Sequence, residues 1–102
     1  MDRRLQLHEE LCSILGSRHA YFQPPESVKL SYPCIIYGRN NADTKHADNV
    51  PYLYRKQYEL TIITKDPDDP LVDAVATHFQ SIRFNRHYTA DNLNHDVFLL
   101  YW

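Results

Sequence analysis

The stretch YLYRKQYELTIIT, residues 52–64, alternates apolar and polar side chains with the two-residue period of a β-strand. Its apolar side carries Tyr52, Tyr54, Tyr58, Leu60 and Ile62. Its polar side carries Arg55, Gln57, Glu59 and Thr61. The pattern predicts a long strand that buries one face. We expect the polar side to be a sheet face or edge in contact with solvent. The alternative is that it forms a polar lining inside an assembly.

The segment before this strand predicts its antiparallel neighbour. Residues 29–37 read as a strand that starts after Pro33, unless Pro33 lies at a sheet edge, because proline cannot donate to the ladder. Residues 38–51 are polar and end at Pro51, so we expect a loop of ~14 residues between the two strands. A connection this long exceeds what a hairpin needs, and such loops are more often functional than incidental.

Two helices flank the predicted strand pair. Residues 2–15 carry apolar side chains at helical spacing, with Asp2 as the N-cap and Gly16 in place to end the helix. A second helix is expected over residues 70–82, because Asp68 or Asp69 can cap it and Pro70 suits the first helical position.

Two short strands close the chain. In FNRHYTA, residues 84–90, Phe84, Arg86 and Tyr88 alternate against Asn85 and His87, and VFLLYW, residues 97–102, is a continuous apolar run. The order α–β–β–α–β–β predicts a single α+β (α/β) domain over residues 1–102, an antiparallel four-stranded sheet with both helices on one face. The predicted core is Leu11, Leu15, Ile36, Leu60, Ile62, Val75, Phe79, Phe98 and Leu100.

Composition narrows the function classes. The net charge is -2, which argues against a dedicated nucleic-acid binder. Cys12 and Cys34 lie in apolar contexts and read as buried thiols of a reducing compartment, although a disulfide stays open. The sequence shows neither a signal peptide nor a membrane-spanning run, so we expect synthesis in the cytoplasm and no membrane partner. Eight tyrosines suit a protein with several interfaces, and strand propensity is the alternative explanation.

Candidate reaction sites are weak. Asp43, His46 and Asp48 are residues of metal-ligand type, but their spacing matches no metal motif, and Asp and Asn favour loops for local hydrogen-bonding reasons. His78, His87 and His95 have no nucleophile signalled beside them. Only two glycines are present, so a glycine-rich phosphate loop is excluded. We therefore expect no enzyme activity, no metal and no cofactor.

Several stretches together resemble the tail terminator, or tail completion, proteins that join head and tail in long-tailed phages. The resemblance covers roughly residues 4–102 and rests on an N-terminal helix followed by YPCIIYG, residues 32–38. The polar segment, long strand and helix start of residues 40–75 and the closing hairpin with its aromatic end, residues 84–102, extend it.

This resemblance implies a virion protein of the phage tail that forms a hexameric ring. Such a ring caps the tail tube, stops its polymerisation and docks a head-completion or connector protein, while DNA passes through the lumen without specific binding. We expect residues 39–51 to be a mobile loop that becomes ordered in the ring. The expected interface residues are Asn40, Asn41, Asp43, His46, Asp48, Tyr52, Tyr54 and Arg55. A head-completion or stopper protein of the phage neck is the alternative, and a small metal-binding or enzymatic domain is the rival from another class.

Overall fold

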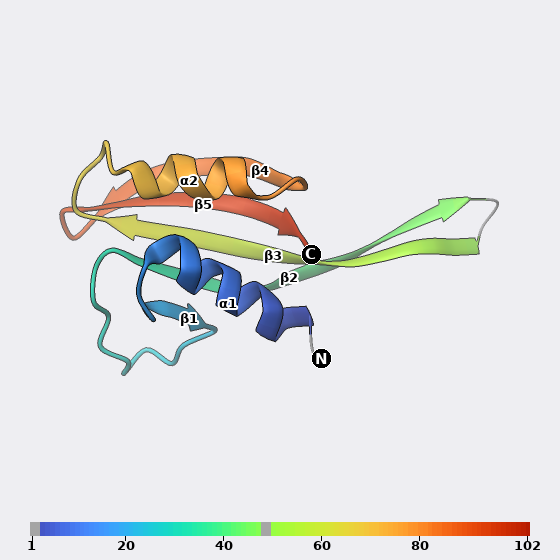
Figure 1. The fold of residues 1–102 in the computed structure, drawn as a ribbon, viewed down its shortest axis with the longest axis horizontal. Coiled ribbons are helices and arrows are strands. Elements are labelled where there is room, and N and C mark those ends of the chain that lie inside the picture. The colour runs from blue at the N-terminus through green and yellow to red at the C-terminus, as the bar shows by residue number, and fades with distance from the viewer. Residues whose placement is uncertain (1–2, 48–49) are drawn as a thin grey trace.

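Five strands form one sheet in the computed structural model of the chain, and two helices pack on it (Figure 1). The structure describes residues 3–47 and 50–102, and for residues 41–55 it describes the backbone alone. The elements are α1 (Arg3–Leu15), β1 (Ala20–Phe22), β2 (Cys34–Ala47), β3 (Val50–Thr64), α2 (Pro70–His78), β4 (Ile82–Ala90) and β5 (Leu93–Tyr101). The mixed α+β class predicted from the sequence is confirmed.

The sheet differs from the prediction in its strand number and in one strand direction. Its order is β1-β2-β3-β5-β4, and β1 runs parallel to β2, with Tyr21 beside Ile36. The prediction of four antiparallel strands is therefore wrong in this detail. The missed strand is only three residues long, too short to show a period in the sequence. The remaining neighbours are antiparallel as expected.

One face of the sheet, the core face, is covered by both helices. It carries Ile35, Tyr37, Tyr58, Leu60, Ile62, Phe98 and Leu100, all buried in one cluster with Leu7 and Leu11 of α1 and with Leu71 and Val75 of α2. Seven of the nine predicted core residues are buried, and Leu15 and Ile36 are the two that stay partly exposed. Ile36 lies on the opposite, outer face of the sheet, next to Thr61 in the register.

The two helices begin and end by different means. Gly16 ends α1 with φ +72, a left-handed conformation that glycine adopts without steric cost. Asp69 caps α2, because its Oδ1 accepts a hydrogen bond of 2.8 Å from the Leu71 amide, and Pro70 follows at the first helical position. The predicted cap Asp2 lies outside the described residues.

The second helix is shorter than the predicted 70–82. It ends at His78, and Phe79 is already extended, with φ -100 and ψ 146. Phe79 is buried and meets the Trp102 ring edge-on, at 5.9 Å between centroids. The chain is extended at Phe79, and the Phe79 ring packs against Trp102. This tertiary contact outweighs the helical spacing that had predicted a longer helix over residues 79–82.

A bulge divides β4 into two halves. Phe84 pairs with Phe98, but Arg86 pairs with Val97, so Asn85 is an extra residue. Arg86 consequently reaches Glu59 on the outer face, at 3.7 Å, while the next residue, His87, pairs with Asp96. The predicted alignment of Phe84, Arg86 and Tyr88 on one side is thus wrong, because a bulge reverses the alternation.

Candidate functional site

A long β-hairpin projects from the body of the molecule, and we call its outer part, residues 40–55, the arm (Figure 1). Pairing of β5 with β3 stops at Gln57, and β1 pairs with β2 only up to Tyr37. Beyond these points β2 and β3 pair only with each other among the described residues. The arm therefore gives the molecule its long axis of 48 Å against 26 and 24 Å for the other two.

The arm replaces the predicted loop. Residues 38–47 and 50–51 are strand rather than loop, so that prediction is wrong. Asn, Asp and Lys are poor strand formers, which is why the sequence reads as a loop. The backbone groups of this segment find their partners on the strongly strand-forming residues that follow, and this pairing overrides local propensity.

All predicted interface residues except Asp48 fall on the described backbone of the arm. The register sets Asp43 opposite Arg55, Thr44 opposite Tyr54 and His46 opposite Pro51. Asn40, Asn41, Asp43 and His46 belong to β2, and Tyr52, Tyr54 and Arg55 to β3. Asp48 lies outside the described residues, and so do the side chains of residues 41–55, including the Asp43 and His46 side chains.

A chain of amide side chains fixes the base of the arm. Asn40 donates from Nδ2 to Gln57 Oε1 at 2.8 Å, and Gln57 donates from Nε2 to the Tyr101 hydroxyl at 2.8 Å. These bonds link β2, β3 and β5 across the sheet. Gln57 is only 8% exposed, so the expectation that it faces solvent is wrong. Its partners come from distant parts of the sequence, and no local pattern could have revealed them.

The edge of β2 is closed at one point next to the arm. Gln23 ends β1 with φ 44, and its Oε1 accepts a hydrogen bond of 3.0 Å from the Arg39 amide. Gly38 makes this possible, because a Cβ there would come within 3.0 Å of Gln23 Cγ. The Gln23 side chain thus bonds the Arg39 amide, which a further residue of β1 would otherwise have paired with.

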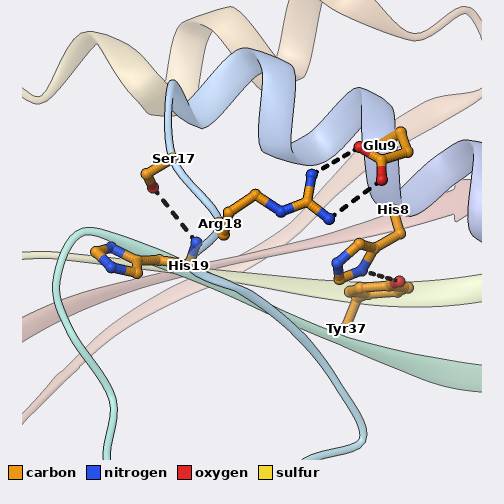
Figure 2. A network of polar contacts seen from close by, with 6 residues as sticks. All are labelled: His8, Glu9, Ser17, Arg18, His19 and Tyr37. Atoms are coloured by element: carbon orange, nitrogen blue, oxygen red, sulfur yellow. Dashed lines mark hydrogen bonds and ion pairs between the residues drawn. The ribbon is translucent and has the colours of Figure 1, made fainter.

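A polar network ties α1 to the sheet behind the arm (Figure 2). His8 Nδ1 and the buried Tyr37 hydroxyl share a hydrogen bond of 2.7 Å. Burial and the nearby Arg18 guanidinium lower the pKa of His8, and burial raises the pKa of Tyr37. On the surface Arg18 binds both Glu9 carboxylate oxygens, at 2.7 and 3.1 Å, which lowers the pKa of Glu9. The arrangement links α1 to β2 and favours the neutral form of His8.

The other histidines meet carboxylates. His87 Nδ1 lies 2.8 Å from Asp96 Oδ1, and His78 Nε2 lies 2.9 Å from Glu10 Oε1 beside an open hollow of about 220 Å³. His95 stacks on Tyr88 with ring centroids 4.7 Å apart. A histidine–carboxylate pair orients an imidazole, but nucleophilic catalysis also needs a nucleophile within reach of that ring. These contacts join neighbouring elements of the fold.

Two further features bear on site chemistry. Cys12 and Cys34 are free and buried, as predicted, and burial raises the pKa of the Cys34 thiol to about 11. Where side chains are described, no group of three or more His, Cys, Asp or Glu is placed to hold a metal ion. Across residues 3–47 and 50–102, no helix is long and apolar enough to cross a membrane.

Comparisons with protein-family models, curated proteins and solved structures found no match to this chain.

Proposed function

We propose that this chain is a structural subunit that assembles through its arm into a ring. The arm is the observation that supports this most directly. A two-stranded hairpin is marginally stable in water when nothing packs on it. This one extends well beyond the strands and helices that form the core. Contacts from a neighbouring subunit would supply the packing that the chain itself does not give to the arm.

The setting we propose is the tail of a long-tailed phage, on the sequence resemblance described above. The ring, a hexamer by that resemblance, would cap the tail tube, stop its polymerisation and present a surface for a head-completion or connector protein. DNA would pass through its lumen without specific binding, which fits a net charge of -2. The protein would be made in the host cytoplasm, act in the virion without enzyme activity, and need neither cofactor nor membrane.

A neck protein that completes or plugs the head is the second candidate within this setting. It would use the same arm for assembly but would bind the portal side of the neck rather than the tail tube. Electron microscopy of purified protein mixed with tail tubes and with tailless heads separates the two. Density at the end of the tubes supports the terminator, and density only on heads supports the neck protein.

The mass of the protein in solution tests the assembly step. We expect species near six subunits at high protein concentration or on addition of tail tubes, and the matched control is a variant in which an Asn-Gly turn replaces residues 44–54. That variant keeps the pair Asp43 and Arg55. The Lys56 carbonyl accepts from Trp102, so the backbone of Arg55, the preceding residue, faces β2, and a two-residue turn can close the pair. Assembly of the variant equal to that of the wild type would contradict a role for the arm. A monomeric wild type under all these conditions would contradict the ring.

A further inference from the structure

The sheet presents two unlike edges that no strand of the described chain covers. At one side lies β4, the last strand in the order. At the other, β1 shields β2 over three residue pairs, and the Gln23 side chain closes the Arg39 amide. From Asn40 to Ala47, no described strand pairs with the outer edge of β2. Backbone groups on such an edge are ready to pair with another strand.

Of the two arm strands, β2 offers the better edge. The β3 part of the arm contains Pro51, which has no amide hydrogen to donate. Its edge is also limited by Trp102, whose amide donates to the Lys56 carbonyl at 3.0 Å. The β2 part has a register shift at Asn40 and Asn41 and then runs from Ala42 to Ala47 without proline. An incoming strand therefore finds a longer series of donors and acceptors on β2.

The edge at β4 lacks most of the features that protect sheet edges. It is nine residues long, contains neither proline nor lysine, and is exposed from Arg83 to Ala90. Phe84 and Tyr88 are 53% and 41% exposed. Isolated proteins usually blunt such a strand, so a long exposed edge with aromatic side chains indicates a partner strand. The bulge at Asn85 and the charges of Arg83 and Arg86 are protective features, but the bulge leaves strand on both sides.

We propose that the outer edge of β4 in one copy pairs with the Asn40–Ala47 edge of the β2 arm in the next copy. This rests on the proposed function and names the surface that receives the arm. At ~3.4 Å per residue the eight-residue arm edge spans about 27 Å and β4 about 30 Å. Because the two edges are different, a contact uses β4 of one copy and the arm of the next. Each of these two copies still has its other edge free for a further contact. Such head-to-tail contacts close into a ring when the rotation between copies closes.

The amide of Phe84 is the point at which this pairing can be blocked. The Tyr101 amide donates to the Ser81 carbonyl at 3.0 Å, so Ser81 faces β5. Antiparallel strands alternate inward and outward backbone groups, which turns the Phe84 amide outward and the Arg83 amide toward Leu99. Phe84→Pro removes the outward donor, and edge strands tolerate proline. Phe84→Ala removes the same ring but keeps the donor, so it is the matched control.

Both variants lack the exposed ring, so they are compared with each other: we expect Phe84→Pro to need at least about tenfold more protein for assembly than Phe84→Ala, one lost ladder bond being roughly a factor of ten. Equal assembly of both variants overturns the pairing while the ring stands.

Hydrogen exchange on the wild type gives a second readout that does not depend on how the proline variant folds. The Phe84 amide should exchange quickly in the free subunit and slowly in the ring, whereas the Arg83 amide should be protected in both states. A ring in which the Phe84 amide still exchanges quickly overturns the proposal. Protection of Phe84 that arises only on binding tail tubes assigns the edge to the tube protein and also overturns it. A chain that never assembles refutes the ring and this pairing together.

Discussion

The body of this molecule and its arm use the same strands in two different ways. In the body, the core face of β2 and β3 is buried, and both helices cover it. In the arm, the same strands continue as a two-stranded ribbon with polar residues such as Asn41, Asp43 and Lys45. Burial stabilises the first, and what the structure describes of the second is a backbone ladder between two strands. Under the proposed function, stability depends on the body and assembly on the arm, so substitutions should affect the two separately.

The largest effect on stability is expected from Phe79→Ala in the body. The ring is 8% exposed and packs in the core cluster against Trp102, so its removal should cost ~3–5 kcal/mol. Chemical denaturation followed by circular dichroism measures this. Phe84→Ala is the control, because that ring is 53% exposed and should cost about 1 kcal/mol or less. Similar costs for both would refute the division into buried body and exposed edge.

A smaller effect is expected where the arm joins the body. Gln57→Ala leaves the Asn40 amide and the Tyr101 hydroxyl without their shared partner, and should cost ~1–3 kcal/mol. Lys56→Ala, at an exposed neighbouring position, should stay within ~0.5 kcal/mol. The same denaturation assay compares them. If Gln57→Ala were as neutral as Lys56→Ala, the hydrogen-bonded base of the arm would contribute nothing to the fold.

The His8 network predicts a modest dependence of stability on pH. Burial and the nearby Arg18 hold the pKa of His8 in the folded protein below the ordinary value of 6.5, so the unfolded chain binds the proton more readily. The stabilisation is therefore complete above the unfolded pKa and is lost as pH falls through 6.5 toward the folded pKa. His8→Gln should reduce the difference in unfolding free energy between pH 7.5 and pH 5.5. An unchanged or steeper dependence in the variant would rule out His8 as its source.

The smallest effect on stability is expected from removal of the arm. With an Asn-Gly turn in place of residues 44–54, the unfolding free energy should change by no more than about 1 kcal/mol, because every described residue of the core cluster is kept. Deleting residues 42–48 alone is the contrasting variant. It removes the β2 half and leaves the β3 half unpaired, so we expect it to aggregate. A large loss of stability in the symmetric variant would make the arm part of the body's fold.

The sequence predicted the body better than the arm for a physical reason. Period-two alternation at Tyr58, Leu60 and Ile62 reflects their burial on the core face. Residues 38–49 of the arm hairpin are mostly polar and show no such alternation, so the sequence predicted a loop there. The bulge at Asn85 and the bonds of Gln57 depend on partners far along the chain, which no local pattern encodes.

The segment predicted to hold the interface residues has a conformation different from the one expected. Seven of the eight expected interface residues lie on the arm, yet as strand rather than loop. Whether they contact a neighbour stays a prediction. The second edge, β4, was missed because exposed edges depend on strand order, and the sequence alone did not specify which strand would be outermost.

The bulge at Asn85 shifts the register of β4 by one residue, so the side chains after it change faces of the sheet. If Asn85 were instead paired in the ladder opposite Val97, each later position would pair one step further along β5, and Arg86 and Tyr88 would lie on the core face. The alternation of side chains between the two faces in residues 86–90 is therefore opposite in phase to that of residues 82–84. In divergent forms of this chain, losing the position of Asn85 is expected to preserve the pairing of Arg86 with Val97. Gaining a residue elsewhere in β4 would reverse the faces of everything beyond it.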